Sequence, residues 1–370
     1  MFFEGISSQA ILFFSLYGIT GGVPFIAAVY LLFRRGNAFA PQVTPPMRLR
    51  RWAAAFYGVS ALGHVWWYLF YIYSKDIHSI AYVVIVTFDC VALLTTIAGT
   101  LLAMLQDRKR PFWPVFAAMI PFVVLGLFQI LFPQTSFMEV ASIYFLSLYV
   151  LFSAYMAFSV RQYEHWLNDN YADLENKKVW LSQVVSLVCM LLFILYVFVD
   201  LDNYLIYLLH AAELILFCLL LWRIETLPQL DSIPQPDTVT ESQNPNQVEQ
   251  APAVPANIDL SNIEKLLNKK CVATGLYLQH DLSLQQLAQA LGTNRYYLSQ
   301  YFRAQGINYN AYINGLRINH FISRYHEVAA TRQSFTVQQL ASESGYHSYS
   351  TFSLAFKQRM GQSVTAWMSK

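Results

Sequence analysis

Charged side chains are scarce in this sequence. Only 12% of its 370 residues are charged, against roughly 25% in an ordinary soluble domain. Hydrophobic residues make up 56% and aromatic residues 16% of the chain. This balance argues against a wholly soluble protein and indicates long membrane-embedded stretches joined to a soluble part.

Cysteines and catalytic motifs are also lacking. Cys90, Cys189 and Cys218 lie inside apolar runs and Cys271 stands alone, so neither a disulfide framework nor a metal-ligand spacing is present. We interpret all of them as small buried hydrophobes. The sequence has no phosphate-cradling glycine loop, no Gly-x-Ser-x-Gly elbow and no His-Glu-x-x-His motif. It therefore predicts neither an enzyme nor a resident cofactor or metal.

Long apolar runs dominate the first 225 residues. A helix needs about 20 apolar residues to cross roughly 30 Å of hydrocarbon. Seven runs meet this length: 10–33, 52–73, 80–105, 112–132, 138–160, 180–199 and 204–222. The sequence thus predicts a seven-span helical bundle in a lipid bilayer.

Basic residues in the connections predict the orientation of these spans. Loops after the odd-numbered spans hold eleven Lys or Arg, and loops after the even-numbered spans hold only Lys75. By the positive-inside rule the odd loops are cytoplasmic. Arg34 and Arg35 follow the first span and nothing basic precedes it, so it does not resemble a secretory signal. We expect a protein of the inner membrane whose N-terminus lies outside the cytoplasm and whose C-terminal domain lies inside it.

Ionisable side chains occur in the interior of three spans. Asp89 lies roughly 14 Å into its span at 1.5 Å per residue, and Glu213 lies equally deep in the last one. His210 shares a helix face with Glu213, and His64 is near the middle of the second span. Such residues are costly in lipid. We interpret the four either as a ligand or proton site, in which Asp89 and Glu213 pair with the histidines, or as a polar cluster that holds helices together.

Two polar segments connect the predicted parts. The loop 161–179 is mixed in charge with interspersed aromatic residues, and it is interpreted either as a solvated loop or as a contact for the tail domain. Residues 224–256 carry five acids and no base, and six of the fourteen prolines lie between Pro228 and Pro255. This composition predicts a flexible linker over residues 226–257.

The tail contains a repeat. Ser283-Leu-Gln-Gln-Leu-Ala288 recurs as Thr336-Val-Gln-Gln-Leu-Ala341, and a glycine follows each copy, Gly292 and Gly345. A small alanine allows two helices to cross closely, and glycine accepts the positive φ of the intervening turn. The repeat therefore predicts two helix-turn-helix copies, and apolar residues at helical spacing from Tyr312 to Phe321 predict one long connecting helix.

The second helix of each copy has an inward apolar face and an outward polar face. Leu298 and Phe302 point inward in the first copy, and Phe352 and Phe356 do so in the second. We expect contacts to double-stranded DNA from the outward residues Asn294, Arg295, Tyr296, Ser299, Gln300, Arg303, Ser348, Tyr349, Ser350, Ser353 and Lys357, with Arg317 of the connecting segment added. From Asn257 onward the chain holds 11 Lys or Arg and 5 Asp or Glu, a net of +6 that suits such a partner.

The tail resembles the DNA-binding domain of the AraC/XylS family of transcriptional regulators. The resemblance is carried by Leu284-Gln-Gln-Leu-Ala288, Leu298-Ser-Gln-Tyr-Phe302, Tyr312-Ile-Asn-Gly-Leu-Arg317-Ile and the run from Leu340 to Gly361. It implies promoter binding by recognition helices at about 294–305 and 348–360. Val364 stands where the family usually has proline, and Met368 stands where it has a basic residue.

These patterns predict an all-α protein with three parts: a transmembrane, sensor-like domain over residues 1–225, the linker over 226–257, and an AraC-type DNA-binding domain over 258–370. The predicted function is a membrane-anchored transcriptional regulator. A homodimer partner, RNA polymerase and an unknown signal ligand are further partners that this reading allows. The alternative is a seven-span transporter or intramembrane enzyme whose tail docks proteins or regulates its own expression.

Overall fold

The computed structural model describes residues 8–74, 76, 79–133, 137–198, 203–230, 260–331 and 334–369. Every regular element within these ranges is a helix, which confirms the all-α prediction. The chain divides into two compact units. The first comprises Met1–Tyr163 and Asn176–Gln235, and the second comprises Glu164–Glu175 and Pro236–Lys370.

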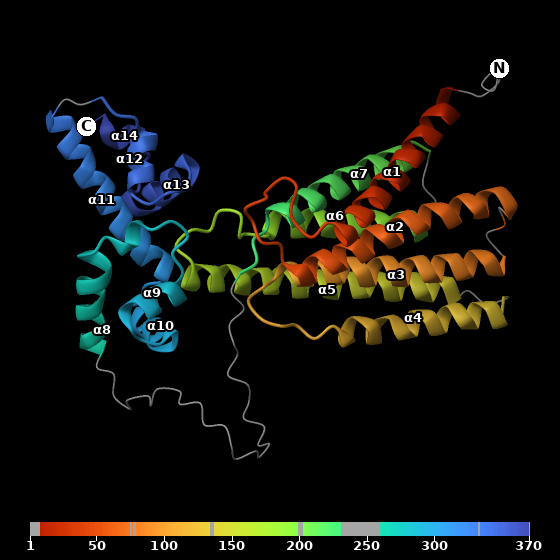
Figure 1. Cartoon of the computed structure of the whole chain (residues 1–370). Helices are drawn as coiled ribbons and strands as arrows, with labels where there is room; N and C mark the ends of the chain where they lie inside the picture. Colours follow the sequence, from red (N-terminus) through yellow and green to blue (C-terminus); the bar gives the residue numbers. More distant parts are fainter. Residues whose placement is uncertain are drawn as a thin grey trace, which may run out of the picture. The chain divides into compact units, whose positions relative to one another are not determined.

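The described part of the first unit contains seven helices that lie side by side (Figure 1). Their bounds are α1 Ser8–Phe33, α2 Met47–Tyr73, α3 Ile80–Met104, α4 Trp113–Leu131, α5 Phe137–Asn170, α6 Trp180–Phe198 and α7 Asn203–Thr226. Each overlaps one predicted span, and α2 begins five residues before its span. Helix α5 runs ten residues beyond its predicted span, and its last turns, from Glu164, belong to the second unit.

Five of these helices, α1, α3, α4, α5 and α7, are long and apolar enough to cross a membrane. Helix α2 is not among them, and its first turns carry Arg48, Arg50 and Arg51. The apolar part of α6 within the described residues, Trp180–Ile194, is shorter than a span. Length and composition therefore support membrane association. They support five of the seven predicted crossings, those of α1, α3, α4, α5 and α7.

Large apolar side chains cover the outer surface of the bundle. Phe25, Ile26, Leu131, Ile143 and Leu151 are all more than 60% exposed. Exposed apolar surface is unfavourable in water, and large patches of it are therefore rare on soluble proteins. Facing lipid tails it costs nothing, which agrees with a membrane location.

A buried ion pair joins two ends of the first unit. Arg50 Nη1 lies 3.3 Å from Glu225 Oε1, and the side chains are 1% and 0% exposed. Arg50 also donates to the backbone carbonyls of Leu31 and Arg34, and to the Asn37 side chain. Arg50, one of the loop cations that predict the orientation, therefore has a structural role as well.

The second unit contains the remaining helices. They are α8 Leu260–Leu267, a π-helical turn Asn268–Val272, a 3₁₀ turn Leu276–Leu278, α9 Leu284–Leu291, α10 Arg295–Ala304, α11 Tyr309–Thr331, α12 Val337–Glu343, α13 Tyr349–Met360 and α14 Val364–Met368. The predicted long connecting helix is confirmed as α11. It contributes Ile313 to one hydrophobic core, with α8, α9 and α10, and Phe321 to another, with α12, α13 and α14.

Local capping explains why the repeated phrase forms helices. Ser283 accepts a hydrogen bond from the Gln286 backbone, and the Gln286 side chain returns to the Ser283 backbone. Thr336 and Gln339 make the same capping box in the second copy. Each box satisfies two donors that a helix N-terminus leaves unpaired.

Glycine closes both turns. Gly292 has φ +73° and Gly345 has φ +89°, as predicted from the repeat. A Cβ on Gly345 would also lie 2.8 Å from the Leu278 carbonyl oxygen, so no other residue fits there. Residues 226–230 of the predicted linker are described, with Leu227 and Leu230 buried, and the rest of it, 231–257, lies outside the described residues.

Candidate DNA-binding surface and intramembrane cluster

Helix α10 has one buried apolar face and one polar face that points away from the core. Leu298 and Phe302 are 0% and 3% exposed and fix the helix in its core. Asn294 caps the helix by accepting from the Tyr296 backbone N–H. Of the predicted DNA-contacting residues here, Asn294, Tyr296 and Arg303 are exposed, and Arg295, Ser299 and Gln300 are half-buried.

Helix α13 repeats this arrangement. Phe352 and Phe356 are both 0% exposed, and Ser348 caps the helix by accepting from the Thr351 backbone N–H. The predicted contacts divide into exposed Tyr349, Ser350 and Lys357 and half-buried Ser348 and Ser353. Leu354 is 54% exposed on the same helix. In both helices the predicted inward residues are buried, and six of the eleven predicted outward residues are exposed; their contact with DNA stays a prediction.

Arg317 is placed differently from the prediction. Its side chain is 0% exposed and its Nη1 lies 2.9 Å from Asp173 Oδ1. Its Nε and Nη2 donate to the carbonyls of Tyr277 and Gln279. A guanidinium whose donors are used inside the fold cannot reach a phosphate, so Arg317 is a structural residue and the prediction that it contacts DNA is wrong.

The segment 164–175 packs into the second unit, so the solvated-loop interpretation is wrong. Ala172 is part of the core around α9 and α10, and its N–H donates to the Leu282 carbonyl at 3.2 Å. Arg295 donates to the Asn170 side chain. Ser348 and Thr351 both donate to Glu175 Oε2 at 2.7 Å. Two residues predicted to contact DNA, Arg295 and Ser348, thus already have partners from this segment.

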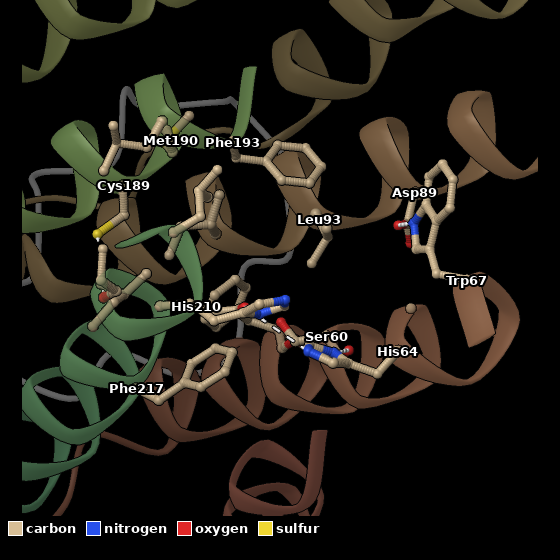
Figure 2. A pocket seen from close by; sticks show the side chains of 18 of the residues that line it. Ser60, His64, Trp67, Asp89, Leu93, Cys189, Met190, Phe193, His210 and Phe217 are labelled. Atoms are coloured by element: carbon tan, nitrogen blue, oxygen red, sulfur yellow. Dashed lines mark hydrogen bonds and ion pairs between the residues drawn. The ribbon is translucent and has the colours of Figure 1, made fainter. Parts of the chain in front are cut away.

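Three of the four predicted intramembrane residues come together. Glu213 Oε2 lies 3.5 Å from His210 Nδ1 and 3.8 Å from His64 Nε2. Thr20 of α1, which sequence reasoning missed, places its hydroxyl 3.1 Å from His64 Nε2 and 3.4 Å from His210 Nδ1. We call Thr20, His64, His210 and Glu213 the polar cluster. Figure 2 shows the rings of His64 and His210 beside each other.

Asp89 does not pair with a histidine as predicted. Its Oδ2 accepts from the Trp67 indole Nε1 at 2.6 Å, and Figure 2 shows the two side chains together. A cavity of about 150 Å³ is lined by Asp89 and by His64, His210 and Glu213 of the cluster. Asp89 therefore shares the cavity with the cluster but belongs to a separate hydrogen bond.

Comparison with known proteins bears on the tail. Residues 287–370 match a family model described as a helix-turn-helix domain. The matched range includes α10 and α13 with the predicted DNA-contacting residues from Arg295 onward. No curated protein and no solved structure matched the chain. The match confirms the helix-turn-helix prediction and indicates a regulatory domain rather than a catalytic one.

Proposed function

Because the C-terminal domain is an AraC-type helix-turn-helix domain, we propose that this protein is a membrane-anchored transcriptional regulator that reads DNA with two recognition helices. The observation that carries the proposal is the pair of capped helices α10 and α13, whose outward polar faces stand on two cores joined by the continuous helix α11. A rigid connection of this kind suits binding in successive major grooves about 34 Å apart.

The outward residues divide by chemistry. Tyr296, Gln300 and Ser350 carry neutral donors and acceptors that suit base edges, and Arg303 and Lys357 carry charges that suit phosphates. Burial lowers the pKa of Arg295 from its ordinary value. That shift reflects its enclosed position beside Asn170 rather than an open phosphate-binding position.

The membrane part is proposed to hold this reader at the bilayer, with the C-terminal domain in the cytoplasm. The distribution of eleven basic residues in odd-numbered loops against Lys75 in the even-numbered ones supports this orientation. We further propose that the polar cluster and its cavity receive the signal, because ionisable residues at bilayer depth are rare without a function.

Genome-wide crosslinking of the intact protein to DNA, with membranes fractionated in parallel, tests the proposal. We expect discrete sites in the membrane fraction that disappear when Tyr296 and Gln300 are both replaced by Ala. Gln289→Ala changes an exposed polar residue of α9 that does not face outward from a recognition helix, and it should keep every site. Crosslinks spread evenly over the genome would contradict sequence-specific reading, and C-terminal labelling from outside the cell would contradict the orientation.

A further inference from the structure

The polar cluster has the composition and spacing of a metal site. Two imidazoles and one carboxylate converge from α2 and α7, and their ligand atoms all lie within 4.8 Å of one another. Bonds of about 2.0–2.2 Å to a tetrahedral ion place neighbouring ligand atoms roughly 3.3–3.6 Å apart. The distances of 3.5 Å and 3.8 Å from Glu213 to His210 and His64 need only a small adjustment to reach this value.

Hydrogen bonding prepares His64 to act as a ligand. Its Nδ1 lies 2.8 Å from the Ser60 carbonyl oxygen, which can only accept, so Nδ1 carries the hydrogen. In neutral histidine the Nε2 lone pair then points toward the Thr20 hydroxyl, 3.1 Å away, and toward Glu213, so a bound ion would take the place of the Thr20 contact. A ring nitrogen bonded to a backbone carbonyl is the usual support of a metal-ligating histidine, because it fixes both tautomer and orientation.

The three candidate ligands are largely buried, but a small ion can reach them from the cavity that they line. The side chains of His64, His210 and Glu213 are 13%, 14% and 29% exposed, and all three residues line the cavity described above. Three protein ligands with a free position beside them are typical of metal sites that exchange ions or bind a further small ligand.

We propose that His64 Nε2, His210 Nδ1 and Glu213 Oε2 bind a divalent transition-metal ion of the zinc class. Imidazole with one carboxylate suits Zn²⁺ and its neighbours in the first transition row rather than Mg²⁺ or Ca²⁺, which prefer oxygen ligands alone. The ion would tie α2 to α7, the helix that continues into the linker. The idea that this ion is the sensed signal rests on the proposed function; the binding itself does not.

Metal binding is measured on the full chain, purified in detergent without a polyhistidine tag and stripped with a chelator. One sample is titrated with Zn²⁺ and a separate metal-free sample with Co²⁺. We expect one Co²⁺ per chain with visible absorption of a tetrahedral or five-coordinate ion. His64→Gln and His210→Gln should each weaken binding by about 100-fold or more. Asp89→Asn is the matched control, because it removes a carboxylate from the same cavity without removing a ligand.

Three results would overturn the site: no stoichiometric ion, affinity unchanged in both histidine variants, or equal loss in Asp89→Asn. A cluster that takes up only a proton gives the first result. In that event the proposed regulator can still sense through the cluster, and the DNA-crosslinking experiment decides that question separately.

A second, independent observation concerns the segment 164–175, which we call the clamp. Asn310 of α11 donates to the carbonyls of Tyr171 and Ala172 at 3.1 and 2.6 Å. Asp173 accepts from Arg317 and from the Asp281 backbone at 2.9 Å each. These contacts make the clamp part of the second unit rather than a loop beside it.

The clamp touches both recognition helices. Asn170 accepts from Arg295, the first residue of α10, and Glu175 accepts from Ser348 and Thr351 at the start of α13. It carries four acids, Glu164, Asp169, Asp173 and Glu175, and no Lys or Arg. An acidic segment beside the first residues of both recognition helices repels the DNA backbone and occupies hydrogen-bond donors that DNA would otherwise meet.

We infer that the clamp is an autoinhibitory contact, which restrains the DNA-binding domain through a segment continuous with helix α5. Movement of α5 is then a direct route from the membrane to the reader, since residues 164–170 form its last turns. DNA binding requires that Asn170 and Glu175 release α10 and α13.

The test uses the full chain in nanodiscs and a labelled random-sequence duplex of about 25 base pairs, enough for two major grooves. Glu175→Gln and Asn170→Ala should each raise affinity several-fold. Glu164→Gln removes the same charge from the clamp without a side-chain bond to either helix, and it should leave affinity unchanged. Equal gains in Glu164→Gln would mean a general charge effect, and no gain in the two contact variants would refute autoinhibition.

Discussion

Arg317 and Asp173 form a buried ion pair that joins α11 to the segment 164–175. Their atoms Nη1 and Oδ1 are 2.9 Å apart, and the side chains are 0% and 4% exposed. The other donors of the guanidinium bond the Tyr277 and Gln279 carbonyls, and the other carboxylate oxygen accepts from the Asp281 N–H. A charge pair removed from water is tolerable only with such full satisfaction, so both residues are structural.

Removing Asp173 alone should destabilise the second unit strongly. Asp173→Ala leaves Arg317 buried without its partner, which costs about 3–5 kcal/mol. The free energy of unfolding is measured in the full chain by denaturant titration, with hydrogen exchange of the α11 backbone amides as the signal. The double variant Asp173→Leu with Arg317→Met should recover only part of it, because it removes the unpaired charge but also takes the Arg317 donors away from the Tyr277 and Gln279 carbonyls. Equal stability of Asp173→Ala and wild type would contradict a structural ion pair.

Local signals made most of the tail predictable. Ser283, Gln286 and Gly292 cap and close α9 through contacts within a few residues, so the sequence alone carries the information. The clamp was not predictable in the same way. Asp173 lies 144 residues from Arg317, and a single sequence holds no sign of which distant charges meet.

The membrane cluster was predictable in depth but not in pairing. Helical rise places His64, His210 and Glu213 at a common level. Which carboxylate lies next to the histidines depends on the rotation of each helix about its axis. In the structure Asp89 accepts a hydrogen bond from Trp67 instead. Thr20 was not predictable, because a single hydroxyl in an apolar run has no distinctive sequence pattern.

Tyr296 and Arg303 should affect DNA binding in different ways. Tyr296→Ala should reduce discrimination between a crosslinked site and random duplex, by about 1–3 kcal/mol if it reads one base pair. Arg303→Ala should weaken both duplexes alike and reduce the slope of log affinity against log salt by about 1. Fluorescence anisotropy at several salt concentrations separates the two effects. A uniform loss in Tyr296→Ala would place that residue on the backbone of DNA rather than on its bases.

The Arg50–Glu225 pair should be needed for a stable first unit. Glu225→Ala leaves the Arg50 charge and the backbone N–H of Ala38 without their carboxylate. We expect a loss of about 3–5 kcal/mol, as for other broken buried pairs. Thermal unfolding in detergent measures it, and Glu139→Ala, which changes an exposed acid of α5, should be neutral. A small effect would mean that water replaces the carboxylate.

Cys271 should titrate far above an ordinary thiol. Its side chain is 0% exposed, and burial raises the pKa of the thiol from 9.0 to about 11, because desolvation disfavours the thiolate. The folded state therefore holds the proton more tightly than the unfolded state. Its contribution to stability is complete below about pH 9 and is lost as pH rises from 9 toward 11.

Alkylation by iodoacetamide reports this shift in a chain whose other cysteines, Cys90, Cys189 and Cys218, are replaced by Ala. In the native chain the rate at Cys271 should rise about tenfold per pH unit from 8 to 10 without levelling off, since only the thiolate reacts. In urea the same rate should be higher and should level off near pH 9, the ordinary thiol pKa. A native rate that levels off there as well would show that Cys271 is open to water, and would contradict the packing of α8 and α9 around it.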